Sequence, residues 1–379
     1  MDTQKILNRD FILAFFAQFA LSSVFQILIP TLPIYLSRLG STEVEIGILI
    51  GTLSISSLVL RPFVGRALLR IPERNFMIAG AFFFALISIA FLLTSSFWPF
   101  LIVRVFQGIG FAFFYTASVT LIANISPEAH RGKSISYFFL SSNIAFVLAP
   151  SFGMFLINRF SFTLLFLVCF GISSCSLFIT TRLRKRQVNS LVASSIEDGS
   201  FFSRKALPPA IVGFFEGIIW GTLITFFPLY ALNHGIANPG FFFTVYAIMI
   251  ILGRVLGGRI LDIYSRESVI LFSLIFYIIS MIILSFSKTL LMFILAAAIL
   301  GIGNTFLIPS LVAAALDRVG SSRGPAMGTF TAASDFGMGL GPVIMGIILS
   351  LSNYQIMFLC LALTGLIDLN YFYFFVKKK

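Results

Sequence analysis

Long apolar runs dominate the pattern of hydrophobic and polar positions along this chain. Twelve stretches of about 20 apolar residues are separated by short segments that carry charged and turn-forming residues. In hydrocarbon, every backbone amide must be satisfied within its own segment, so runs of this length predict helices and not strands. The predicted spans are Phe11 to Leu36, Ile46 to Val64, Met77 to Thr94, Phe97 to Ile122, Ser134 to Leu156, Phe162 to Thr180, Ala210 to Ala231, Phe241 to Gly257, Val269 to Phe286, Leu290 to Leu316, Ala326 to Leu351 and Tyr354 to Val376.

The composition points to the same class of protein. Of the 379 residues, 58% are hydrophobic and only 11% are charged, which excludes a water-soluble enzyme. Twelve crossings leave only short connections, so no separate soluble domain fits. We predict an all-α membrane protein whose first apolar run is retained as a span and not cleaved as a signal peptide.

Basic residues are distributed unevenly between the two sides of the predicted membrane. If the N-terminus is cytoplasmic, most of the 26 Lys and Arg residues fall on the cytoplasmic side, while Arg38, Arg159 and Lys288 fall on the other. The positive-inside rule then places both termini in the cytoplasm. The net charge of +12 comes from residues that flank helices, so we expect a lipid bilayer around the chain and no nucleic-acid partner.

The two halves of the chain repeat each other at a nearly constant separation of residue numbers. The difference in residue number between Arg61 and Arg254 also relates several other matching residue pairs. They are Gly65 and Gly258, Arg66 and Arg259, Gly108 and Gly301, Gly110 and Gly303, and, within two residues, Gly40 and Gly235, Asn143 and Asp335, and Pro150 and Pro342. We predict two pseudo-symmetric six-helix bundles, 1–180 and 210–379, joined by a cytoplasmic linker at 181–209. Parallel repeats of this kind place a solute site near the membrane midplane between the bundles.

Several motifs resemble those of the major facilitator superfamily, and the resemblance covers nearly the whole chain. The loop from Arg61 to Leu69 resembles that family's basic loop motif, and Arg104 to Ala112 is similar to its intramembrane arginine motif. Ala145 to Gly153 resembles the glycine-proline motif of proton antiporters, with alanines at 145 and 149. Asp335 to Pro342 is similar to a segment of small bacterial efflux-type permeases. The resemblance implies the major facilitator fold in the plasma (inner) membrane of a prokaryote.

The resemblance also implies a conformational latch on the cytoplasmic side. Leu69 and Pro72 stand where the family's first loop usually has an acidic residue and a glycine, whereas the second copy keeps Asp262. An acidic side chain at that place can hold the cytoplasmic face closed by facing the positive end of a helix dipole. We therefore assign Asp262, Arg66 and Arg259 to the latch.

One basic side chain within the spans, that of Arg104, is a candidate for direct function. Inserting an ionised group near the bilayer centre costs about 2.5–3.5 kcal/mol of free energy. Such a group is therefore expected to have a partner, contact with water or a functional role. Arg104, with Gln107 one turn along the same face, is expected to bind an anionic group or to act on a carboxylate through its field. The alternative is a buried arginine that ties helices together through backbone carbonyls.

Three carboxyl groups complete the set of intramembrane charges. Burial favours the neutral form of a carboxyl group, so Glu216 is expected to carry a proton, beside an aromatic wall made by Trp220 one turn away. Asp335 aligns with Asn143, and only the carboxyl group can exchange a proton, so Asp335 is assigned to proton coupling or substrate binding. Hydrogen bonding between helices is the alternative for both acids. Asp368, within about two turns of Lys377, is expected to snorkel to the membrane surface or to pair with a basic loop; solute contact is the alternative.

Uncharged polar side chains in the spans are candidates for lining a central cavity or for hydrogen bonding between helices. They are Gln18, Gln26, Tyr115, Asn143, Tyr230, Tyr246 and Asn304.

These features favour a secondary transporter that moves a small organic solute by alternating access, coupled to protons. With Glu216 and Asp335 against Arg104, we predict export of a neutral or cationic amphipathic compound; the alternative is uptake of a sugar-like or other small metabolite by proton symport or facilitated diffusion. The only histidines, His130 and His234, lie in loops, so a metal site and a membrane-embedded enzyme are disfavoured. No nucleotide-binding loop supports a primary pump. We expect a monomer without a cofactor.

Overall fold

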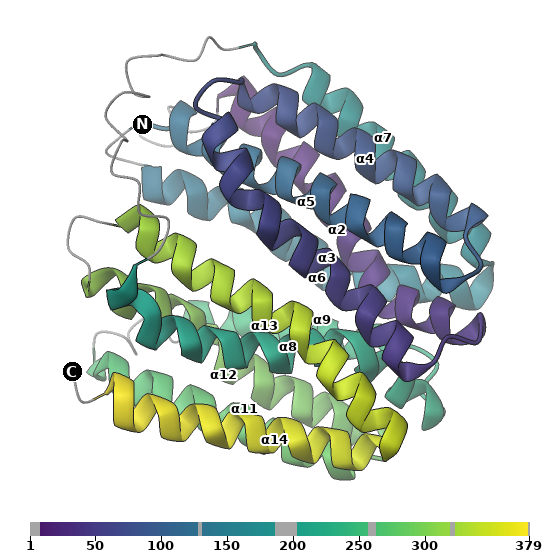
Figure 1. The fold of residues 1–379 in the computed structure, drawn as a ribbon, viewed down its shortest axis with the longest axis vertical. Coiled ribbons are helices and arrows are strands. Elements are labelled where there is room, and N and C mark those ends of the chain that lie inside the picture. The colour runs from purple at the N-terminus through teal and green to yellow at the C-terminus, as the bar shows by residue number, and fades with distance from the viewer. Residues whose placement is uncertain (1–7, 128–130, 186–202, 257–262, 319–322, 378–379) are drawn as a thin grey trace. The chain divides into compact units, whose positions relative to one another are not determined.

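The computed structural model describes residues 8–127, 131–185, 203–256, 263–318 and 323–377. Every element of regular structure in these ranges is helical (Figure 1). The elements are α2 (Arg9–Arg38), α3 (Glu43–Ala67), α4 (Glu73–Leu93), α5 (Phe97–Ile125), α6 (Arg131–Arg159), α7 (Phe162–Thr181), η3 (Arg204–Ala206), α8 (Leu207–Asn233), α9 (Gly240–Leu256), α11 (Arg266–Phe286), α12 (Leu290–Asp317), α13 (Arg323–Leu351), α14 (Tyr354–Tyr371) and η4 (Phe372–Val376).

Their lengths and composition fit a membrane protein. Within the described ranges, 11 helices are long and apolar enough to cross a bilayer. The remaining one, α9, contributes the shorter apolar stretch Gly240–Val255, directly before residues 257–262, which lie outside the description. The predicted all-α membrane architecture is therefore confirmed.

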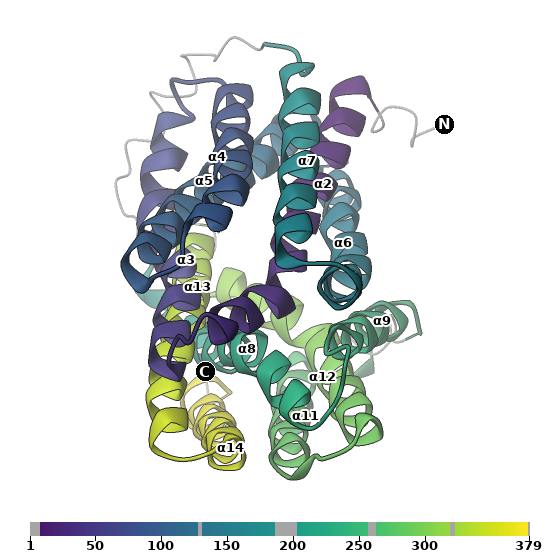
Figure 2. The same cartoon turned by 90° about the vertical axis from the view of Figure 1, so that its right-hand side faces the viewer.

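The chain divides into two compact units. Unit 1 comprises Met1–Thr31 and Ile55–Gly199, and unit 2 comprises Leu32–Ser54 and Ser200–Lys379. In unit 1, α4 packs along α5 and α7; in unit 2, α8 packs along α13, and α11 packs along α12 and α14 (Figures 1 and 2).

The hairpin of residues 32–54 belongs to unit 2, although it comes from the first half of the sequence. Small residues explain the placement, because they let backbones approach closely in lipid. A Cβ atom added at Gly47 or Gly51 would collide with the backbone carbonyls of Pro342 and Gly339 on α13. A Cβ at Gly346 would lie 2.7 Å from the carbonyl oxygen of Glu43.

Equivalent glycines make equivalent contacts in the two units, as the internal repeat predicts. A Cβ at Gly110 would lie 2.8 Å from Cβ of Phe83 and 3.3 Å from Cδ2 of Phe84. A Cβ at Gly303 would lie 2.9 Å from Cβ of Phe276 and 3.5 Å from Cδ2 of Tyr277. Each of these residues is related to its counterpart by the separation that relates Arg61 to Arg254. The α4–α5 pair is thus reproduced by the α11–α12 pair.

The turns and the polar side-chain contacts between helices repeat as well. Gly40 and Gly235 have positive φ angles of 84° and 76°, the left-handed conformation that glycine adopts readily after a helix. Each is followed by a bond that closes the helix end, from Ser41 N to Leu36 O (3.1 Å) and from Ile236 N to Ala231 O (3.0 Å). In unit 1, Asn124 Nδ2 donates to Glu73 Oε1 at 2.6 Å, and the equivalent pair in unit 2 is the ion pair of Arg266 with Asp317.

Candidate functional site

Glu216 lies in the interior of unit 2, on α8. Its residue is only 8% exposed, and the hydroxyl of Tyr277 on α11 donates a hydrogen bond to its Oε1 at 3.1 Å. Tyr277 is itself almost fully buried. A buried carboxyl group without a partner would be strongly unfavourable, and this bond supplies one.

An aromatic stack adjoins this acid. The ring of Trp220, one turn along α8 from Glu216, stacks on Tyr246 of α9 with centroids 4.8 Å apart and planes inclined by 24°. Phe243 meets the edge of Trp220 at 6.4 Å. Because Trp220 follows Glu216 by one turn of α8, the stack lies next to the carboxyl group. A flat or cationic group is the ligand that such an acid and stack would hold.

Asn304 on α12 completes the arrangement. Its side-chain amide donates a hydrogen bond to the hydroxyl of Tyr246. The approach depends on Gly301, where a Cβ would lie 2.7 Å from the carbonyl oxygen of Tyr246. Oδ1 of Asn304 is buried and makes no hydrogen bond within the described residues, so it is available as an acceptor. We call Glu216, Trp220, Tyr246, Tyr277 and Asn304 the Glu216 cluster.

Sequence analysis named four members of this cluster and missed Tyr277. The repeat carried a signal for it, because the equivalent position in the first half is Phe84. A tyrosine in place of phenylalanine adds one hydroxyl to an otherwise conserved helix contact. Only the fold shows that this hydroxyl reaches Glu216.

Unit 1 holds the predicted intramembrane arginine. Arg104 and Gln107 on α5 are 5% and 1% exposed, and Nη1 of Arg104 donates to Oε1 of Gln107. The two side chains that the sequence places on one face therefore bind each other.

A second cationic side chain of unit 1 lies against aromatic rings. The guanidinium carbon of Arg61, on α3, is 5.7 Å from the ring centroid of Tyr115 and 5.8 Å from that of Phe111. Phe111 and Tyr115 stack at 5.4 Å. The sequence places Arg61 at the end of the predicted span Ile46 to Val64, as an anchor at the membrane surface. Helix α3 continues to Ala67, and the guanidinium of Arg61 lies against rings of α5.

The polar side chains of α2 have separate roles. Gln18 donates to Ser22 Oγ at 3.0 Å and to Ser142 Oγ at 3.1 Å, and it accepts from Ser118 Oγ at 3.1 Å. This network joins α2, α5 and α6, so Gln18 binds helices together. Gln26 on α2 and Asn143 on α6 are half-buried in unit 1, and Oε1 of Gln26 makes no hydrogen bond within the part of the chain described.

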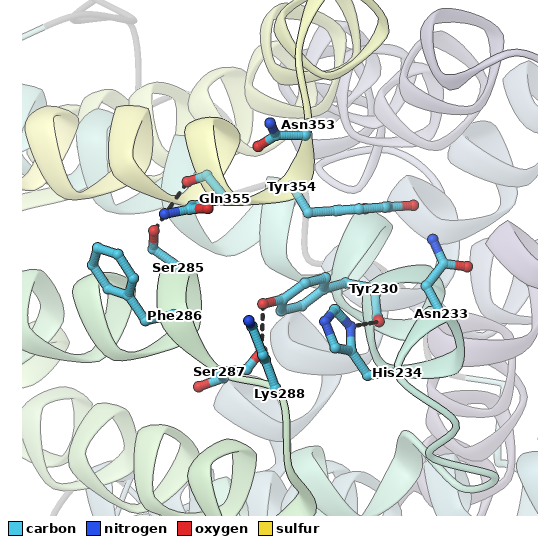
Figure 3. A pocket seen from close by; sticks show the side chains of 10 residues that line it. All are labelled: Tyr230, Asn233, His234, Ser285, Phe286, Ser287, Lys288, Asn353, Tyr354 and Gln355. Atoms are coloured by element: carbon cyan, nitrogen blue, oxygen red, sulfur yellow. Dashed lines mark hydrogen bonds between the residues drawn. The ribbon is translucent and has the colours of Figure 1, made fainter.

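Tyr230 lies away from the Glu216 cluster, about 21 Å further along α8 at 1.5 Å per residue. It forms part of a pocket of about 460 Å³ at the ends of α8, α11 and α14 (Figure 3). The Tyr230 hydroxyl is 2.9 Å from the carbonyl oxygen of Leu284 and 2.6 Å from that of Ser287, while Nδ1 of His234 lies 3.0 Å from the Tyr230 carbonyl oxygen. Tyr230 therefore holds α8 to the end of α11.

The remaining assigned residues are placed as follows. Asp335 is half-buried on α13, one turn from Gly339 on the side that meets α3. Arg66 is exposed in the last turn of α3. Arg259 and Asp262 lie outside the described residues. In the described ranges, no group of three His, Cys, Asp or Glu side chains is arranged to hold a metal ion.

Asp368 departs from its expected position. The side chain was predicted to snorkel to the membrane surface or to pair with a basic loop. The residue is 0% exposed, and neither carboxyl oxygen makes a hydrogen bond within the described ranges. The prediction is wrong because α14 packs against α11 and α8 along this face. The acid is directed into unit 2 and away from the helix end.

Comparisons with known proteins agree with this architecture. The model of the Major Facilitator Superfamily matches residues 14–242 and 210–379. The staphylopine export protein of Staphylococcus aureus is 26% identical over 370 residues, which cover 92% of this chain and 89% of that protein. The quinolone resistance protein NorA of Staphylococcus aureus is 26% identical over 150 residues, 40% of this chain and 39% of that protein. The crystal structure of a mutant of nucleoside transporter NupG matches with a TM-score of 0.81 at 14% identity, over 97% of this chain and 100% of that one.

Proposed function

The chain belongs to the major facilitator superfamily of membrane transporters, and on that premise we propose that it is a proton-coupled exporter of a small organic solute. The observation that carries the proposal is Glu216, an acid buried in unit 2 and bonded to Tyr277. A carboxyl group in a dry interior changes its charge when a proton arrives or leaves, which lets proton binding bias two conformations of a transporter. Alternating access converts that bias into transport.

The chemistry of the Glu216 cluster supports a neutral or cationic amphipathic solute. Trp220 and Tyr246 present a stacked aromatic pair next to the acid, and Asn304 offers an acceptor. A flat apolar solute stacks on the rings, and a positive charge is attracted both by the rings and by the carboxylate.

The arginines of unit 1 support a second candidate, a solute that carries a carboxylate. Arg61 lies over the rings of Phe111 and Tyr115, and Arg104 is buried on α5. Guanidinium groups bind carboxylates through charge-assisted hydrogen bonds. The staphylopine export protein matches 92% of this chain, so staphylopine is included in the test beside a lipophilic cation.

The names of the relatives support export as the direction of transport, since one is an export protein and one a resistance protein. Uptake by symport or facilitated diffusion is the alternative. We further propose that the protein is a monomer in the plasma (inner) membrane with both termini in the cytoplasm, because basic residues gather in the segments on that side. The cytoplasmic latch that the family resemblance implies also stays a proposal.

Proteoliposomes with an imposed pH gradient and a membrane potential clamped at zero test the proposal. The probes are ethidium, a quinolone, staphylopine and a sugar. An antiporter accumulates its solute in acid-inside vesicles and a symporter in alkaline-inside vesicles, whatever the orientation of the protein. For one proton per solute, each pH unit supplies about 1.4 kcal/mol and supports up to about tenfold accumulation.

Glu216→Gln is the decisive variant, because it keeps the size of the side chain and an acceptor for Tyr277. We expect accumulation to fall to the level of protein-free vesicles while solute exchange without a gradient continues. Glu267→Gln, at an exposed position in the first turn of α11, is the matched control and should accumulate like the wild type. Full accumulation by Glu216→Gln would refute coupling through this acid. Asp335→Asn is measured in parallel to decide whether α13 also takes part.

A further inference from the structure

Asp368 is a buried acid for which the helix packing of α14 gives no reason. Its residue is 0% exposed, and both of its carboxyl oxygens are buried without a hydrogen bond inside the described ranges. A carboxyl group in this state is strongly unfavourable if ionised, and buried polar groups in native proteins nearly always have partners. The position of Asp368 in unit 2 therefore calls for a functional explanation.

The packing of Gly365 fixes the level at which Asp368 lies. A Cβ at Gly365 would be 3.0 Å from Cγ1 of Ile278 on α11 and 3.8 Å from Cδ1 of Ile219 on α8. Helices α8 and α14 run in opposite directions in unit 2 (Figure 1). One turn further along α14 is Asp368, and one turn back along α8 is Glu216, so the two acids lie at the same level.

Electrostatic interactions link the two acids to each other and to their neighbours. Asp368 interacts with Glu216, and both interact with Tyr277, which also bonds to Glu216. The other titratable groups that face the pair are Tyr246 on α9 and Tyr371 at the end of α14. Two basic groups act on these tyrosines, Arg254 on Tyr246 and Arg318 on Tyr371. Within the described ranges, no ion pair neutralises either acid.

The equivalent interface of unit 1 is closed without any acid. The helix caps Ser161 of α7 and Asn353 of α14 align the two helices, and this alignment relates Asp368 to Ser176. Ser176 is buried and donates to the carbonyl oxygen of Ala17 on α2 at 2.9 Å. Phe84 stands in place of Tyr277. The same packing therefore forms with a serine and a phenylalanine, so the acids of unit 2 are not required for helix contact.

We propose that Glu216 and Asp368 form a carboxyl pair that binds the transported proton, with Tyr277 positioning Glu216. That the bound proton is transported rests on the proposed function. The pair itself rests on the packing of unit 2. Two close carboxyl groups in a dry interior do not both ionise, so the pair carries one negative charge or none. Uptake of one proton turns the singly charged pair into a neutral pair, and release restores the charge.

Infrared spectroscopy of the full chain in lipid tests the pair without any solute. The carbonyl stretching band of protonated carboxyl groups is followed during a pH titration, and the Glu216 contribution is assigned by its loss in Glu216→Gln. In Asp368→Asn, we expect the titration midpoint of the Glu216 band to move by about one pH unit or more, as for coupled sites. Asp368→Ser, which installs the residue that unit 1 uses, should give the same result and guards against an asparagine-specific folding defect.

Asp317→Asn is the matched control, because Asp317 is an exposed acid of unit 2 with a side chain 66% exposed. It should leave the Glu216 band unchanged. A Glu216 midpoint that stays in place in both Asp368 variants would overturn the pair.

The transport assay separates this inference from the proposed function. If the infrared coupling is present but the wild type shows no gradient-driven accumulation of any probe, proton-coupled transport fails and the pair stands as a proton-binding site. If the wild type and Asp368→Asn both accumulate a probe fully and the Glu216 midpoint is unmoved, the pair fails and the proposed function stands. We expect Asp368→Asn to lower accumulation at least tenfold at a gradient of two pH units.

Discussion

The hydroxyl of Tyr277 provides the most direct test of the Glu216 cluster, because it can be removed without disturbing the packing. In unit 1, Phe84 makes the same contact with Gly110 that Tyr277 makes with Gly303, so the ring of Tyr277→Phe is expected to fit. The change removes only the 3.1 Å hydrogen bond to Oε1 of Glu216. That bond is worth about 0.5–1.5 kcal/mol to a neutral carboxyl group and about 1.5–3 kcal/mol to an ionised one.

The loss of stability should therefore grow with pH. At acid pH, where Glu216 is protonated, we expect Tyr277→Phe to lower the unfolding midpoint by about 1–3 °C; at alkaline pH, the reduction should be about twice as large. Thermal unfolding in detergent over a pH series measures both. In the Glu216→Gln background, the acceptor no longer ionises, so the pH dependence should vanish.

Tyr264→Phe, at an exposed position, is the control and should change the free energy of unfolding by less than about 0.5 kcal/mol. The reasoning fails if Tyr277→Phe costs the same at every pH, or if its pH dependence survives in Glu216→Gln. Either outcome would mean that the hydroxyl does not sense the charge of Glu216.

Two further predictions follow from the packing of the units. Tyr230→Phe should destabilise the protein by about 1 kcal/mol in thermal unfolding, because the hydroxyl binds the carbonyls of Leu284 and Ser287. The KM of an accumulated probe should stay within twofold of the wild type. A large change in KM would indicate that Tyr230 contacts the solute. Gly110→Ala and Gly303→Ala should each lower the free energy of unfolding by about 1–3 kcal/mol, since the added Cβ meets a neighbouring Cβ within 2.9 Å. Gly65→Ala, where the added Cβ has open space, should not lower it. Unequal losses at the two equivalent glycines would contradict the structural repeat.

Much of the fold was predictable because lipid leaves few alternatives. Apolar runs had to be helices, and the span expected from Leu290 to Leu316 is the helix Leu290–Asp317. The repeat was predictable because a duplicated chain keeps the glycines that its helix contacts require, as Gly110 and Gly303 do. Helix starts near loops were less accurate: α3 begins at Glu43 and α13 at Arg323, each three residues before the predicted span, because polar residues form helical turns outside the hydrocarbon.

The site was only partly predictable. The sequence identifies Glu216, Trp220 and Asn304 as unusual residues for a lipid environment, but it does not say which of them meet. Tyr277 looks like one more aromatic residue until α11 places its hydroxyl on Glu216. Tyr230, which the sequence presents in the same way as Tyr246, proves to hold two helix ends together.

Sequence alone determined that this chain crosses a membrane, that its halves repeat, and which residues carry charge inside the spans, because those properties depend on hydropathy, spacing and residue type. Tertiary structure decided which side of each helix faces which neighbour. The direction of a side chain around a helix axis depends on packing against other helices, and so Asp368, expected near a basic loop, lies buried at the level of Glu216.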